Sequence, residues 1–160
     1  QYLFDKHPDL WWIENNTTLR GMYMGGDQSG DLGNRTFTEK NIKDHGHLGA
    51  LFMDKKADIK MGDTPSVLYL LHGEPARPTT PHWGGAFIQT YPDMRPAYWS
   101  DIPDEALREG DKNGAKTVSR WREEYLSDWA VRMDRVLAAD TKNIVAAYCA
   151  KRIRHLVGII

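Results

Sequence analysis

The clearest pattern along the chain is a stripe of apolar residues in its last third. From about Ala115 to Leu137 these residues recur at steps of three or four, which is the spacing of one face of an α-helix. They are Val118, Trp121, Tyr125, Trp129, Met133 and Val136. The charged residues between them fall mostly off the stripe. The pattern predicts a helix over 115–137 with a buried aromatic face and a solvated charged face.

Two shorter patterns predict elements in the first third. The apolar run from Leu10 to Ile13 includes the pair Trp11-Trp12 and leads into a polar stretch, which is typical of a buried strand. Thr36 followed by Glu39 fits a capping box, and this predicts a short helix from about 37 to 44. We interpret Trp11-Trp12 as part of the core, because large aromatic side chains are usually buried.

A third apolar run, from Val67 to Leu71, fits either a helix or a buried strand. Its length and periodicity do not decide between the two. Asp63 is a good N-cap residue and Pro65 suits the first turn of a helix, but a strand–loop–helix junction would expose Asp63 equally well. On the local residues alone both interpretations stay open.

Residues 72–100 are irregular, with five prolines, the Gly84-Gly85 pair and several aromatic residues. Long ordered loops in a compact domain are usually functional, so we expect this segment to line a site. The tail over 138–160 is more basic. It fits a second amphipathic helix docked on the first, or a truncated or aberrant terminus.

Composition limits the class of protein. The chain has 160 residues, 41% hydrophobic and 27% charged, and its formal net charge is −1. These values are typical of a globular domain with a sizeable core. A near-neutral chain without a long apolar run offers no electrostatic argument for a nucleic acid partner and no membrane span. We therefore expect neither, and a homo-oligomer stays open.

Two places carry candidate chemistry. Asp63 follows Gly62 at a sharp junction, where a carboxylate can bind Ca²⁺ or orient a water molecule, or simply cap the helix. His82 and Trp83 stand beside two glycines in the long segment. The face of a tryptophan can stack on a sugar ring, although Trp83 would equally well fill a hole under the loop.

Several motifs together resemble a known family. They are Gly62-Asp63-Thr64-Pro65-Ser66, Trp83-Gly84-Gly85, Arg120-Trp121-Arg122 and Asp128-Trp129-Ala130-Val131-Arg132. The chain resembles the C-terminal half of the cellulose-binding, nucleoside-hydrolase-like domain of secreted bacterial proteins. The resemblance covers about 1–135 in collinear order. We therefore divide the chain into a partial domain over 1–137 and a tail over 138–160.

The resemblance implies a fold, a site and a location. The implied fold class is α/β, a parallel sheet flanked by helices. Asp63 is similar in context to a metal ligand of nucleoside hydrolases, which implies Ca²⁺ as the cofactor. Glu14 and Asn16 echo the ribose-binding E-x-N of those enzymes, and with His82 and Trp83 they form the expected substrate-binding set. The implied location is secreted or periplasmic.

Three functions follow from these observations. The first is a hydrolase of glycosidic bonds in the intact parent, acting on a sugar-containing or nucleoside-like substrate through metal-bound water. The Asp cluster that such enzymes carry near their N-terminus has no match here, so we leave open whether this chain is an enzyme. The second is a non-catalytic carbohydrate-binding module, with Trp83, Tyr91 and Trp99 stacking on a glucan. The third is a structural fragment that needs the missing half.

Overall fold

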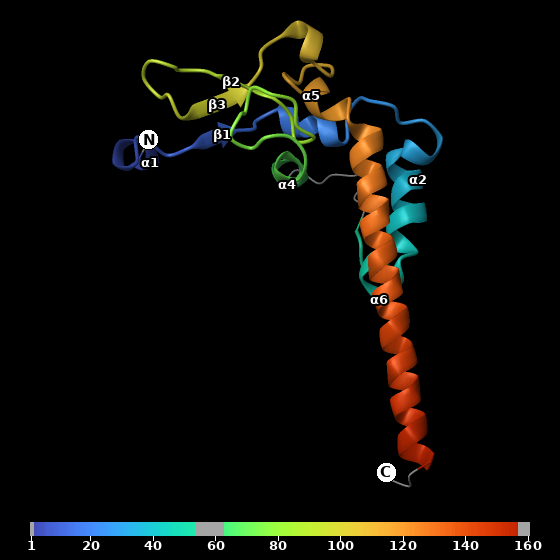
Figure 1. The fold of residues 1–160 in the computed structure, drawn as a ribbon. Helices are drawn as coiled ribbons and strands as arrows, with labels where there is room; N and C mark the ends of the chain where they lie inside the picture. Colours follow the sequence, from blue (N-terminus) through green and yellow to red (C-terminus); the bar gives the residue numbers. More distant parts are fainter. Residues whose placement is uncertain (1, 54–62, 157–160) are drawn as a thin grey trace.

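The computed structural model describes residues 2–53 and 63–156, and for 141 and 144–156 it describes the backbone alone. The described chain has two regions, a small sheet with its surrounding loops and a group of helices along the long helix α6 (Figure 1). Among the described residues, no helix is both long and apolar enough to cross a membrane.

The sheet has three strands: β1 (Trp12–Glu14), β2 (Phe87–Gln89) and β3 (Tyr98–Asp101). The strand β3 lies in the middle, parallel to β1 and antiparallel to β2. The chain is mixed α/β as expected, but within the described residues the expected parallel pairing is limited to β1 and β3. The antiparallel pair is a hairpin that lies almost entirely in the segment 72–100 and ends at Asp101. Prolines and short strands hide the alternation that would identify it.

Short helical turns connect the sheet to the long helix. They are η1 (Thr18–Met22), η4 (Glu105–Leu107) and α5 (Lys116–Ser119), whereas α1 (Tyr2–Lys6) precedes β1 at the far end of the sheet (Figure 1). The turn η1 packs closely on α5 at Gly21, where an added Cβ would lie 2.1 Å from the carbonyl oxygen of Ala115. A contact this close between the two backbones requires a glycine at position 21. The contact holds the segment that follows β1 against the start of the helical region.

The run Val67–Leu71 is helical. It forms α4 (Thr64–Leu71), with Pro65 in its first turn, where the missing N–H costs no hydrogen bond. A Cβ on Gly84 would lie 2.1 Å from the carbonyl oxygen of Pro65, so the loop that follows α4 returns and packs directly on it.

Three short elements lie along α6: α2 (Asn34–Thr38), the π-helical turn η3 (Glu39–Lys43) and α3 (Gly46–Ala50), preceded by η2 (Gly30–Leu32). The predicted capping box is wrong, because the helix already begins at Asn34 and Thr36 lies inside it. Glu39 instead pairs with Arg35 one turn earlier, at 2.8 Å.

The stripe in the last third is confirmed as helix, divided at Arg120 into α5 and α6 (Arg122–Leu156). Its aromatic residues meet the hydrophobic core, with Tyr125 buried and Trp129 and Met133 half-buried against it. The backbone of α6 stays helical through the tail to Leu156, and its last turns extend well beyond the rest of the described chain (Figure 1).

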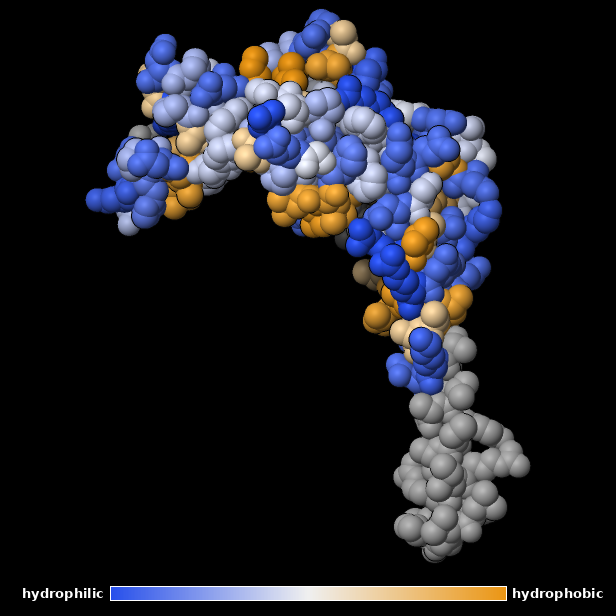
Figure 2. All heavy atoms as spheres, in the orientation of Figure 1, coloured by the Kyte–Doolittle hydropathy of each residue, from blue (hydrophilic) through white to orange (hydrophobic). Residues whose placement is uncertain are grey.

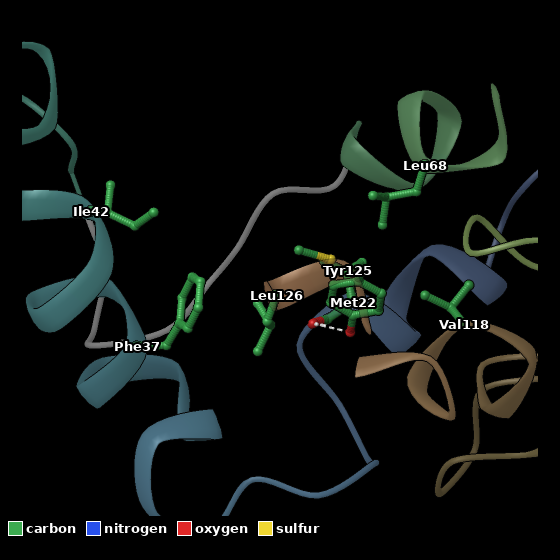
Figure 3. Close-up of a cluster of buried hydrophobic side chains, with 7 residues drawn as sticks. All are labelled: Met22, Phe37, Ile42, Leu68, Val118, Tyr125 and Leu126. Atoms are coloured by element: carbon green, nitrogen blue, oxygen red, sulfur yellow. Dashed lines mark hydrogen bonds between the residues drawn. The ribbon is translucent and has the colours of Figure 1, made fainter. Parts of the chain in front are cut away.

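The core lies where η1, α2, η3, α4, α5 and α6 meet. Its buried residues are Met22, Phe37, Ile42, Leu68, Val118, Tyr125 and Leu126 (Figure 3). Arg122 is also buried, only 1% exposed, and it donates hydrogen bonds to the carbonyl oxygens of Leu32 (3.0 and 2.8 Å) and Met22 (3.1 Å) and to the side chain of Asn34. Arg122 therefore ties the first third of the chain to α6.

Candidate functional site

The two faces of the sheet carry different chemistry. Side chains alternate along a strand, so Ile13 points to one face and Glu14 to the other. The parallel register pairs Ile13 with Trp99 and Trp12 with Tyr98, which gives each face one aromatic residue of β3. We call the face with Trp11, Ile13, Asn15 and Trp99 the tryptophan face, and the face with Phe4, Trp12, Glu14 and Tyr98 the glutamate face.

The tryptophan face carries a pair of indole rings in contact. The ring centroids of Trp11 and Trp99 are 4.4 Å apart and the rings are inclined at 31°. Trp11 is 48% exposed and Trp99 is half-buried, so the pair is open to solvent. The interpretation of Trp11 as a core residue is therefore wrong. Exposed indole rings of this kind offer an apolar platform to a ligand with a flat apolar face.

A groove of about 320 Å³ begins at this platform. It is lined by Trp11, Ile13, Asn15, Ser66, Tyr69, Leu70, Pro75 and Phe87. Ser66 and Leu70 are exposed on α4, and Figure 2 shows apolar atoms gathered on the surface where α4 lies. The groove therefore runs between β1 on one side and α4 on the other.

Two polar side chains line this mostly apolar groove. The amide oxygen of Asn15 accepts a hydrogen bond from the backbone N–H of Leu19 at 2.6 Å, which orients the amide. Its NH₂ group is then the part that a ligand would meet as a donor. The hydroxyl of Ser66 can donate or accept. Such a combination of an apolar groove and a few polar groups is typical of small-molecule sites.

The glutamate face is held by a charged hydrogen-bond group. Glu14 accepts hydrogen bonds from the hydroxyl of Tyr98 and from the side chain of Asn16 (2.9 Å), and both bonds lower the pKa of Glu14. Burial, and then the carboxylate of Glu14, raise the pKa of Tyr98 to about 12. Phe4 covers Tyr98 with its ring centroid 5.7 Å away. The structure thus joins Glu14 and Asn16, with Glu14 as an ionised acceptor.

His82 lies behind the groove. Its ring is fully buried, with Nδ1 2.7 Å from the carbonyl oxygen of Thr80 and Nε2 2.8 Å from that of Glu74. It stacks on Tyr69, a residue of the groove wall, at 4.1 Å. Because both nitrogens already contact backbone carbonyls, this geometry favours an anchor for the loop, and contact between His82 and a ligand stays a prediction.

Trp83 points to the helical region. It stacks on His72 with centroids 5.0 Å apart and rings inclined at 11°, and it is half-buried against the core cluster. This arrangement fits the filling of a hole under the loop, which was the alternative to a sugar-stacking role. Trp83 is not among the residues that line the groove at the tryptophan face.

Asp63 lies exposed at the start of α4, and its neighbour Gly62 lies outside the described residues. Its side chain makes no capping hydrogen bond, and its backbone oxygen accepts from the N–H of Ser66 at 3.2 Å. The side-chain cap is therefore wrong. Ca²⁺ usually takes six to eight oxygen ligands, whereas the described residues hold no group of three or more His, Cys, Asp and Glu side chains placed to share a metal ion. Asp63 is therefore the one carboxylate proposed for the site, and Ca²⁺ at Asp63 stays a prediction.

The predicted site residues are thus spread over four places, and among them Glu14 and Asn16 are joined by a hydrogen bond between their side chains. Sequence reasoning predicted Trp99 as a stacking residue. It did not predict that Trp99 pairs with Trp11 or that a groove lies beside the pair. The strand alternation of Leu10–Ile13 could have indicated that Trp11 and Trp12 face opposite ways. The identity of the exposed face depends on β3, which is far away in sequence.

Comparison with known proteins gives one result. A family model, described as the cellulose-binding Sde182, nucleoside hydrolase-like domain, matches residues 1–87, a segment that includes β1, α4 and the groove. No curated protein and no solved structure matches the chain. Since the match covers more than half of the sequence, this chain belongs to the family of cellulose-binding, nucleoside hydrolase-like domains.

Proposed function

We propose that the chain is a carbohydrate-binding domain that holds a β-glucan on the tryptophan face. The observation that carries this proposal is the exposed pair Trp11 and Trp99 beside a groove with two polar side chains. A pyranose ring with equatorial hydroxyl groups has apolar C–H faces and a polar rim. The indole platform matches the faces, and Asn15 and Ser66 match the rim. Membership of a cellulose-binding family supports a glucan as the ligand.

The test is depletion of the protein from solution by amorphous cellulose. Trp11→Ala should weaken binding by at least about tenfold, because an aromatic residue at the centre of a contact commonly carries much of the binding energy. Tyr91→Ala is the matched control, since Tyr91 is 43% exposed and packs on Tyr98 of the glutamate face, with ring centroids 5.6 Å apart. Equal losses in the two variants, or no loss with Trp11→Ala, would contradict the proposal.

A second proposal concerns Glu14 and Asn16. Their hydrogen bond and the lowered pKa of Glu14 supply an ionised acceptor beside an amide, which suits the hydroxyl groups of a sugar or a nucleoside-like ligand.

Hydrolysis would be an activity of a longer parent protein, which we propose to be secreted or periplasmic and bacterial. Because the Asp cluster of nucleoside hydrolases has no match in this sequence, we expect no turnover of inosine, uridine or a p-nitrophenyl riboside by this chain in the presence of Ca²⁺. Turnover that Asp63→Ala abolishes would overturn that expectation.

A further inference from the structure

The tryptophan face does not offer a flat surface. Its groove has one wall from β1, with Trp11, Ile13 and Asn15, and another from α4, with Ser66, Tyr69 and Leu70. A flat ligand, such as a face of a cellulose crystal, can contact only the rims of a two-walled groove. A single polymer chain can lie between the walls and place one ring on the platform.

The platform itself is too small for a crystal face. Adsorption to such a face requires several exposed, coplanar rings spread along the surface, each resting on a different sugar ring. Trp11 and Trp99 instead touch each other and are inclined at 31°. They therefore form one stacking position. The other exposed aromatic side chains of the sheet region, such as Tyr91, do not line the groove.

The groove also limits the length of the bound segment. Its volume of about 320 Å³ lies at the lower end of the range of about 300–1,000 Å³ for small-molecule sites. That volume suits a short stretch of sugar chain. Asn15 and Ser66 line the groove from its two walls, so a sugar chain between them can receive hydrogen bonds at both edges.

We infer that the groove binds a single free β-glucan chain, as in soluble cello-oligosaccharides and amorphous cellulose, and does not bind the face of crystalline cellulose. This inference rests on the proposed function, because it specifies the form of the same ligand. In this inference the walls of the groove recognise the glucan chain. Ser66 and Asn15 bind the edges of a sugar unit, and Trp11 stacks under its ring.

The first test compares three ligands. Calorimetry with cellohexaose should show binding, and amorphous cellulose should deplete the protein from solution. Microcrystalline cellulose of equal accessible area should retain at least about tenfold less protein. Cellohexaose should also compete the protein off amorphous cellulose, since both occupy the same groove.

The second test blocks the groove and leaves the platform in place. Ser66 is exposed, so Ser66→Phe should fold normally and fill the space between the walls, with Ser127→Phe on the exposed surface of α6 as the matched control. Asn15→Asp keeps the oxygen that Leu19 requires and removes the NH₂ donor. We expect Ser66→Phe to reduce cellohexaose affinity at least about tenfold, Asn15→Asp to reduce it less, and Ser127→Phe to leave it unchanged.

The outcomes separate the inference from the proposed function. If crystalline cellulose retains the protein as well as amorphous cellulose does, and Ser66→Phe changes nothing while Trp11→Ala abolishes binding, the single-chain inference fails and the proposed function stands. If no form of cellulose and no cello-oligosaccharide binds, the proposed function fails and the inference fails with it. Retention by amorphous cellulose that depends on both Trp11 and Ser66 supports both.

Discussion

The helical region and the sheet region use tryptophan in opposite ways. In the helical region Trp83, Trp121 and Trp129 pack against one core. In the sheet region Trp11 and Trp99 face solvent as a pair. The difference follows from how many elements surround the aromatic residues in each region. The helical elements surround their aromatic residues, whereas a three-stranded sheet has too few residues to cover both of its faces. The high aromatic content of the chain thus belongs partly to a core and partly to an exposed pair of rings, and substitutions can separate the two.

The largest effect should come from Arg122→Met in the helical region. This change removes the guanidinium that donates to the carbonyl oxygens of Leu32 and Met22, and leaves Met22 only the longer bond from the Tyr125 hydroxyl, at 3.3 Å. The loss of several hydrogen bonds from one charged, buried side chain should lower the free energy of unfolding by about 3–5 kcal/mol. Arg120→Met at an exposed position is the control and should cost less than about 1 kcal/mol. Urea unfolding measures both, and similar values for the two variants would contradict the structural role of Arg122.

Trp129→Ala should have the next largest effect. Trp129 packs on Phe37 with ring centroids 5.5 Å apart and on Phe52 at 5.9 Å, but it remains half-buried. We expect a loss of about 2–4 kcal/mol, near the lower end of the range for aromatic truncations in a core. Val131→Ala, on the exposed side of the same helix, should cost less than about 1 kcal/mol. Thermal unfolding of the two variants measures both losses, and equal losses would contradict a role of the aromatic stripe of α6 in the core.

On the sheet, Tyr98 should make stability depend on alkaline pH. Its pKa rises from an ordinary value near 10 to about 12 through burial and Glu14, so its neutral form is favoured in the folded state. That contribution is complete below pH 10 and is lost as the pH rises to 12. Tyr69 and Tyr125 have a pKa of about 12 through burial and add the same trend. Tyr98→Phe should make the fall in unfolding free energy over pH 10–12 shallower, and an unchanged slope would contradict this account.

The smallest effect on stability should come from Trp11→Ala. Because Trp11 is 48% exposed, we expect its loss to change the unfolding free energy by less than about 1 kcal/mol, while it removes most glucan binding. Trp129→Ala should show the reverse at temperatures where it remains folded, with lower stability and intact binding. If Trp11→Ala unfolds the protein, the platform is structural and the contrast between the two regions is lost.

The sequence allowed the helix of the last third to be predicted because its stripe persists over many turns. The sheet could not be derived in the same way, since strands of three or four residues show too little alternation. The start of α2 was predicted wrongly because Glu39 pairs with Arg35 one turn earlier instead of with a capping Thr36, and the helix already begins at Asn34. The groove could not be predicted at all, since β1, α4 and the loop at Pro75 meet only in three dimensions.

The parallel pairing of β1 with β3 has a consequence for how the protein folds. Glu14 and Tyr98 lie 84 residues apart, so their pairing must close most of the chain into a loop before any contact offsets the lost entropy. The helical contacts near Arg35 and Glu39 are local and can form earlier. We expect the Trp11–Trp99 pair to assemble late in refolding, and its indole fluorescence to change after the far-ultraviolet signal of the helices has developed.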